Sequence, residues 1–118
     1  MTRRLVIGIG NPLRGDDGVG WRLAEELGPP HQPVHQLTPE CTALLAGCER
    51  VLFVDAWCAA PDAAEPLVRP LSLAAGDAFT AQSVFTHHLD PAALLAISDR
   101  LFGCAPQAWE LLVPAARM

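Results

Sequence analysis

The sequence predicts one α/β domain over residues 1–118, in which a twisted, mostly parallel sheet of about five strands lies between two layers of helices. The length fits a single domain, because domains usually hold ~100–150 residues. Short continuous apolar runs at residues 5–9 and 51–54 are typical of strands covered on both faces. Segments with helical periodicity alternate with the strand-like runs, as in parallel sheets with crossover helices.

Glycine and proline mark the boundaries of the expected elements. Gly28 and the two prolines after it end the first helix, and Pro33 places the second strand at a sheet edge. Pro39 and Pro91 each follow a capping residue and start a helix, and Gly103 ends the last one. The expected order begins with strand 5–9 and a helix that follows Asp16-Asp17 and runs through Trp21 to Leu27. Strand 34–37, helix 38–48, strand 51–54, loop 58–66, strand 67–71, helix 90–102 and strand 109–113 follow.

Composition excludes several kinds of chemistry and of partner. All 8 basic residues are arginine and the chain has no tyrosine, which excludes a Schiff-base lysine and a tyrosine proton donor. A net charge of -5 argues against a nucleic-acid partner. No apolar run approaches the ~20 residues that cross a bilayer, and none after Met1 resembles a signal peptide, so we expect a cytoplasmic protein without a membrane partner.

The four cysteines fit no zinc or redox motif. In a protein without an export signal they are expected to be reduced thiols, and free cysteine usually packs as a small buried residue. The spacing of Cys41 and Cys48 would let both share one helix face in the core. The other two are Cys58 and Cys104. His31 and His35 flank the expected edge strand and are predicted to lie at the surface.

The glycine-rich segment after the first strand is not a dinucleotide-binding loop. Gly8 and Gly10 begin a G-x-G-x-x-G pattern, but Leu13 stands at the third glycine position. Asp16 and Asp17 precede the helix, where carboxylates would repel a pyrophosphate. One of them can cap the helix, so Asp16 is expected to be the cap. Asp17 is then surplus, beside glycines that would let a ligand approach the backbone.

A second carboxylate and an imidazole are expected at the same sheet edge. Asp55 ends the third strand, which is expected to lie next to the first strand and parallel to it. Ligands of open α/β sheets bind outside the carboxyl ends of the strands. From position alone, Asp55 is as well explained as a strand-end cap. His87 and His88 precede the helix that begins at Asp90. Two carboxylates and one imidazole would form a site suited to nickel or zinc, although a single histidine is more often a surface residue.

These residues together resemble a known family. Residues 8–20, then Val54-Asp55-Ala56, then residues 86–89 are similar in order and type to the hydrogenase maturation proteases, and residues 36–40 resemble one branch of that family. Its members are endopeptidases that remove the C-terminal extension from the large subunit of nickel–iron hydrogenases. The resemblance implies that Asp17, Asp55 and His87 are the metal ligands, and that Asp17 and Asp55 are catalytic.

The resemblance also implies the cofactor and the partner. Nickel is expected to arrive already bound in the large-subunit precursor, which is the partner, and the enzyme class is that of aspartic-type peptidases. Members of the family usually continue into a C-terminal helix that this chain is expected to lack, which would expose one sheet face and favour a homo-oligomer. The alternative is a non-catalytic, nickel-sensing hydrogenase assembly factor.

Overall fold

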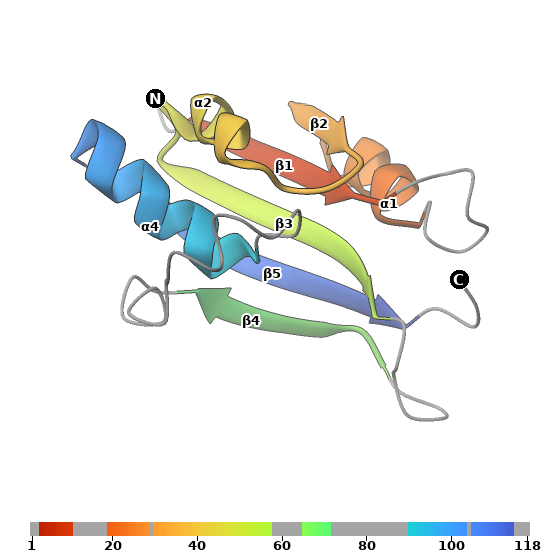
Figure 1. Ribbon diagram of the computed structural model, residues 1–118. Helices are drawn as coiled ribbons and strands as arrows, with labels where there is room; N and C mark the ends of the chain where they lie inside the picture. The colour runs from red at the N-terminus through yellow and green to blue at the C-terminus, as the bar shows by residue number, and fades with distance from the viewer. Residues whose placement is uncertain are drawn as a thin grey trace.

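The computed structural model describes residues 3–10, 19–28, 30–57, 65–71, 90–103 and 105–114. They form a five-stranded sheet in the order β2-β1-β3-β5-β4, with helices on both faces (Figure 1). The elements are β1 Arg4–Ile9, α1 Val19–Leu27, β2 His31–Val34, the 3-10 helix η2 Pro39–Cys41, α2 Thr42–Leu45, β3 Arg50–Trp57, β4 Leu67–Leu71, α4 Pro91–Phe102 and β5 Gln107–Pro114. The predicted three-layer α/β fold is confirmed.

In the part of the chain that is described, no helix is long and apolar enough to span a bilayer.

The sheet is parallel except for one edge. β1 lies between β2 and β3, parallel to both, and β5 continues the parallel set on the far side of β3. β4 runs antiparallel to β5 at the edge. The predicted adjacent, parallel pairing of the first and third strands is therefore correct. Because both strands run in the same direction, their carboxyl ends lie at one edge of the sheet.

The second strand is shifted from its predicted position. It spans His31–Val34, not residues 34–37, and Pro33 pairs with Gly8 in the register. The carbonyl oxygens of Pro30 and Val34 accept hydrogen bonds from the backbone N–H groups of Val6 and Gly10. Pro33 occupies the alternate position of the strand, so its nitrogen, which has no hydrogen to donate, points away from β1. Its edge position is as predicted. Leu37, expected in the strand, is only 2% exposed, in the core beyond the strand's end.

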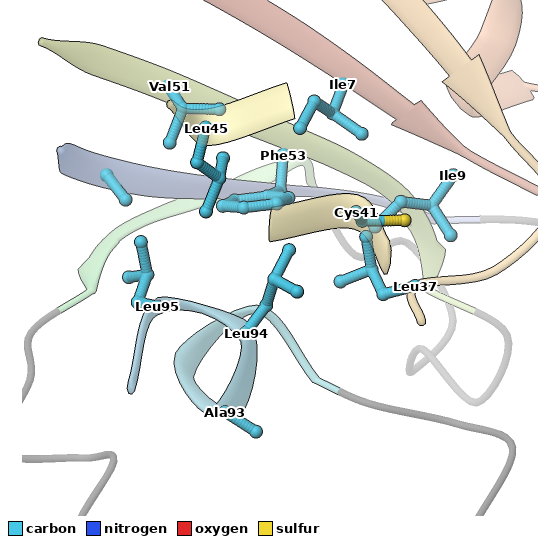
Figure 2. Close-up of a cluster of buried hydrophobic side chains, with 11 residues drawn as sticks. Ile7, Ile9, Leu37, Cys41, Leu45, Val51, Phe53, Ala93, Leu94 and Leu95 are labelled. Atoms are coloured by element: carbon cyan, nitrogen blue, oxygen red, sulfur yellow. The ribbon is translucent and has the colours of Figure 1, made fainter. Parts of the chain in front are cut away.

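The main core lies between the sheet and the layer formed by η2, α2 and α4. Phe53 is fully buried at its centre, against Leu94 of α4 and Leu45 of α2 (Figure 2). Each such side chain contributes ~1.5–3 kcal/mol when it leaves water, so this cluster is the principal source of stability for that layer. Its members are Ile7, Ile9, Leu37, Cys41, Leu45, Val51, Phe53, Ala93, Leu94, Leu95 and Ala108.

Helix α4 has the predicted ends. Asp90 is the N-cap, and its Oδ1 accepts a hydrogen bond of 2.7 Å from the backbone N–H of Ala93. Gly103 ends the helix at φ 75°, a left-handed conformation that glycine adopts without the cost of a Cβ. A capping carboxylate of this kind stabilises a helix by ~1 kcal/mol.

The predicted shared helix face for two cysteines is wrong. Helix α2 ends at Leu45, so Cys48 lies beyond it, half-buried, with its Sγ donating to the carbonyl of Leu44. Cys41 is buried in the core cluster, as expected. Both are free thiols, whereas Cys58 and Cys104 lie outside the described residues. His31 and His35 are exposed, as predicted.

Helix α1 packs on the opposite face of the sheet, and two glycines allow its close approach to β1. A Cβ at Gly8 would lie 2.5 Å from the carbonyl oxygen of Gly20 and 2.8 Å from the Cβ of Ala24. A Cβ at Gly20 would lie 2.5 Å from the carbonyl oxygen of Ile9. Both distances are shorter than side chains tolerate, so the helix lies this close to β1 only because these positions are glycine. Trp21 secures the same helix to β2 with a 2.9 Å hydrogen bond from its Nε1 to a carbonyl.

Gly20→Ala is expected to lower the free energy of unfolding by at least ~1–3 kcal/mol, because its methyl group would press on backbone atoms that cannot turn aside. Gly103→Asn is the control, since nothing lies within 4 Å of a Cβ there and asparagine tolerates positive φ. Urea unfolding followed by circular dichroism measures both. Equal losses in the two variants would contradict the close helix–strand contact.

Candidate functional site

Asp55 lies where β3 loses one of its two neighbours. The strand continues to Trp57, so the prediction that it ends at Asp55 is wrong. It continues because β5 pairs with it further along, placing Leu112 beside Asp55. On the other side the last paired residues are Gly8 and Val54. Asp55 is therefore the first residue of β3 beyond its pairing with β1, at the carboxyl edge of the sheet.

The carboxylate of Asp55 is held by its own backbone. Its Oδ1 accepts a hydrogen bond of 2.8 Å from the backbone N–H of Ala56, and the residue is half-buried. This contact restricts the rotamer of the side chain, which is the behaviour of a strand-end cap. A carboxylate has about four acceptor positions, so the same group can also meet a ligand.

Two described glycines that flank the acidic pair in the sequence, Gly10 and Gly20, lie at this edge. Gly10 directly follows β1, and its backbone N–H donates to the carbonyl of Val34 at 2.9 Å. At the other end of the segment, a Cβ at Gly20 would lie 2.9 Å from the carbonyl oxygen of Val54, the residue before Asp55. Gly10, directly after β1, and Gly20, against Ile9 and Val54, therefore lie at this edge, and segment 11–18 between them lies outside the described residues.

Two glycines of the glycine-rich stretch, Gly8 and Gly20, allow close helix packing. The glycines beside Asp17, which were expected to let a ligand approach the backbone, lie outside the described residues. At Gly8 and Gly20, the space that a side chain would need is filled by the contact between α1 and β1. A glycine-rich stretch before a helix is therefore explained here, at these two positions, by helix packing.

The full predicted ligand set is not among the described residues. Asp17 and His87 lie outside them, as do Asp16 and His88, and Asp55 is the member that the structure places. Within the described ranges, no group of three histidine, cysteine, aspartate or glutamate side chains could hold a metal ion. The convergence of the three ligands stays a prediction.

Sequence reasoning missed one ion pair, between a buried carboxylate and an exposed arginine. Glu110 of β5 has a side chain only 7% exposed, and its Oε1 lies 2.7 Å from Nη2 and 2.8 Å from Nε of Arg69 on β4. The signal was a single acidic residue inside the apolar run 109–113. Buried carboxylates need such a partner, because desolvation of an unpaired charge is costly. The pair links the antiparallel edge strand to the parallel sheet. Arg69 and Glu110 also line a cavity of about 300 Å³, which Asp90 lines as well.

The chain shares its fold with solved hydrogenase maturation proteases. A [NiFe] hydrogenase maturation protease, HycI, from Thermococcus kodakarensis matches with a TM-score of 0.66 and 23% identity, over 99% of this chain and 76% of that one. The hydrogenase maturating endopeptidase HybD from E. coli matches with a TM-score of 0.62 and 19% identity, over 99% and 76%. A hydrogenase 2 maturation peptidase from a Thaumarchaeota archaeon matches at 0.62 and 23%, over 98% and 81%.

At these identities the likeness defines the fold, which is that of the hydrogenase maturation proteases. No protein-family model matches the chain, and no curated protein matches it. The fold that the resemblance implies is thus the fold that the structure has.

A double-mutant cycle tests the ion pair of Arg69 and Glu110. Arg69→Leu leaves the buried carboxylate without its partner and is expected to cost ~1–3 kcal/mol of unfolding free energy. Arg69→Leu combined with Glu110→Leu removes both charges, so it should be less destabilising than the single change. Thermal and urea unfolding measure the difference. A loss in the double variant equal to the sum of the losses in Arg69→Leu and in Glu110→Leu would mean that the two side chains do not interact.

Proposed function

We propose that this chain is a hydrogenase maturation endopeptidase, which removes the C-terminal extension of a nickel–iron hydrogenase large-subunit precursor. The observation that carries the proposal is the fold shared with solved maturation proteases over nearly the whole chain, with Asp55 at the carboxyl edge of its sheet. The precursor is the partner, and the nickel is part of that substrate. We place the reaction in the cytoplasm, where thiols such as Cys41 and Cys48 stay reduced.

Asp17, Asp55 and His87 are the proposed ligands that recognise nickel in the precursor. Carboxylate oxygens and an imidazole nitrogen suit this borderline ion. Chain connectivity supports the pairing of the two aspartates: Asp17 is three residues before Gly20, which packs against Val54, and three residues reach at most roughly 10 Å. Asp55 brings an oriented carboxylate, because Ala56 holds one of its oxygens.

The helix cap of α4 supports the third ligand. His87 is three residues before Asp90, whose carboxylate fixes the start of the helix over the sheet. Asp90 lines a cavity together with Glu110, and Glu110 lies beside Phe53, two residues before Asp55 on β3. An imidazole supplied from just upstream of that helix therefore has a short path to the Asp55 edge.

Two aspartates are chemically sufficient for the hydrolysis. One carboxylate accepts a proton from a water molecule while the oxygen of that water attacks the scissile carbonyl carbon. As the C–N bond breaks, the proton passes to the leaving amine, and the products are the mature C-terminal carboxylate and the released peptide. Asp17 and Asp55 are the proposed pair, because two carboxylates that meet share a proton more easily than they both ionise.

Asp55→Asn is expected to reduce cleavage of a nickel-loaded precursor by ~10²–10⁴-fold, because the amide cannot act as a base. Its stability should stay within ~0.5 kcal/mol of the parent, since the amide oxygen still accepts from the N–H of Ala56. Release of the C-terminal peptide, followed by mass spectrometry, is the measurement. Glu26→Gln, an exposed change on α1, is the matched control and should cleave normally.

Normal cleavage by the Asp55→Asn variant would remove Asp55 from the catalytic site and leave it a strand cap. Binding of the precursor without cleavage by the parent chain would instead identify the non-catalytic, nickel-sensing assembly factor.

The two residues of the acidic pair should separate into a cap and a ligand. Asp16→Ala is expected to cost ~0.5–2 kcal/mol of stability and to leave cleavage largely intact, as for loss of a helix cap. Asp17→Asn should abolish cleavage while leaving the melting temperature unchanged or raised, because it relieves repulsion from Asp55. Melting curves and peptide release are measured for both. Equal losses of stability and activity in the two variants would make Asp17 an ordinary cap.

A further inference from the structure

A cavity of about 300 Å³ lies between the start of α4 and the antiparallel edge of the sheet. Its charged lining comes from three elements, with Arg69 on β4, Glu110 on β5 and Asp90 at the N-cap of α4. Leu71 and Pro91 are among its apolar walls. Ligand pockets usually hold roughly 300–1,000 Å³, so this cavity is at the small end of that range and has room for one side chain.

One oxygen of Glu110 opens onto this cavity. The side chain is only 7% exposed, and both polar contacts from Arg69 are made to Oε1. No described residue donates a hydrogen bond to Oε2. Every fully buried side-chain oxygen in the described ranges has a partner, so Oε2 must reach solvent, and Glu110 lines the cavity. A carboxylate that is more than nine-tenths buried therefore presents an acceptor without a donor.

Asp90 adds a second carboxylate to the same lining. Its Oδ1 accepts from the N–H of Ala93, which leaves Oδ2 without a donor in the part of the chain that is described. The start of α4 offers little to an anion, because Pro91 has no N–H and the N–H of Ala93 is already bonded. Two carboxylates face one guanidinium, which is itself paired with Glu110, so the cavity is complementary to a cation.

A basic side chain matches this lining better than a metal ion does. The apolar walls at Leu71 and Pro91 suit the aliphatic stem of a lysine or arginine, and the two carboxylates suit its charged head. Within the described ranges no three ligating side chains come together. Two carboxylates in a cavity of this size would leave most of the coordination sphere of an ion unfilled.

The cavity lies close to the carboxyl edge that carries Asp55. Glu110 pairs with Phe53, and Leu112 pairs with Asp55, so Glu110 and Asp55 face the same side of the sheet. That side is the one covered by α4, because Phe53 packs against Leu94. Asp55 is two residues further along and one strand across, which places its Cα roughly 8 Å from that of Glu110. An extended substrate covers this distance in two to three residues, at ~3.3 Å each.

We propose that this cavity binds a lysine or arginine side chain of the precursor, two or three residues from the scissile bond. The inference rests on the proposed peptidase function and extends it to sequence preference. Glu110 and Asp90 are then specificity-determining residues, and Arg69 is the residue that holds Glu110 in place. An acidic side chain at that position would bring a third carboxylate to the other two, which selects against it.

Nickel-loaded precursors with lysine or glutamate at the second and third residues on either side of the scissile bond test the proposal. At one of these positions lysine should give a kcat/KM at least about tenfold higher than glutamate. Asp90→Asn combined with Glu110→Gln should lower that ratio to about threefold or less, since asparagine still caps α4 and the glutamine oxygen still accepts from Arg69. Glu49→Gln, an exposed change just before β3, is the matched control and should keep the ratio.

Binding is measured separately from cleavage, by NMR on the full chain. N-acetyl-arginine amide should shift the backbone amide signals of Ala92 and Glu110, N-acetyl-glutamine amide should not, and the double variant should show no shift with either probe. Circular dichroism checks that each variant is folded.

The outcomes separate this inference from the proposed function. Cleavage with no lysine preference at any tested position, with a preference for glutamate, or with a lysine preference that the double variant retains would overturn the inference and leave the peptidase in place. A parent chain that cleaves no precursor would contradict the proposed function, and the arginine probe then decides the cavity by itself. Absence of its shift would overturn the cation site.

Discussion

The parallel pairing of β1 with β3 is the constraint on which the rest of the structure depends. It brings the carboxyl ends of two strands to one edge, and it fixes a surface onto which α1 can pack. The contact of Gly20 with the carbonyls of Ile9 and Val54 then fixes the start of α1 across both strands. Because the pairing of β1 with β3 ends at Gly8 and Val54 while β3 continues along β5, Asp55 has a paired strand on one side only. A polar residue can be tolerated there and remain available to a ligand.

The sequence predicts the elements whose boundaries depend on local chemistry. The edge strand β4, the proline starts of η2 and α4, and the glycine end at Gly103 are all where the pattern places them. Elements whose limits depend on a neighbour are less predictable. β3 is longer than its apolar run because β5 pairs with it as far as Trp57. β2 is displaced because its register with β1, not its own apolar residues, decides which residues form the strand.

The candidate site is predictable to a similar extent. Asp55 could be placed at the carboxyl edge from the strand order alone, and the structure puts it there. The pair of Arg69 with the buried Glu110 could not be predicted, because it depends on which strands are neighbours in three dimensions. The hydrogen bond from Ala56 to Asp55 depends on the rotamer of Asp55, which the sequence does not specify. The glycines show the opposite problem: one sequence pattern serves either ligand approach or helix packing, and the Cβ distances at Gly8 and Gly20 identify packing.

The two faces of the sheet differ in how they are completed. The face under α2 and α4 has a closed core around Phe53, whereas the other face, beyond α1, has an apolar groove with two arginines at its border. The proposed chemistry is at the edge, and the groove is at the opposite end of the same strands.

The most direct measurement of the central claim is a crystal structure of the chain bound to its nickel-loaded precursor. The carboxylates of Asp17 and Asp55 and the imidazole of His87 should converge on the nickel, at the edge where β1 ends. An ion that is not ligated by Asp55, or that is ligated by His88 while His87 points away, would contradict the proposed site.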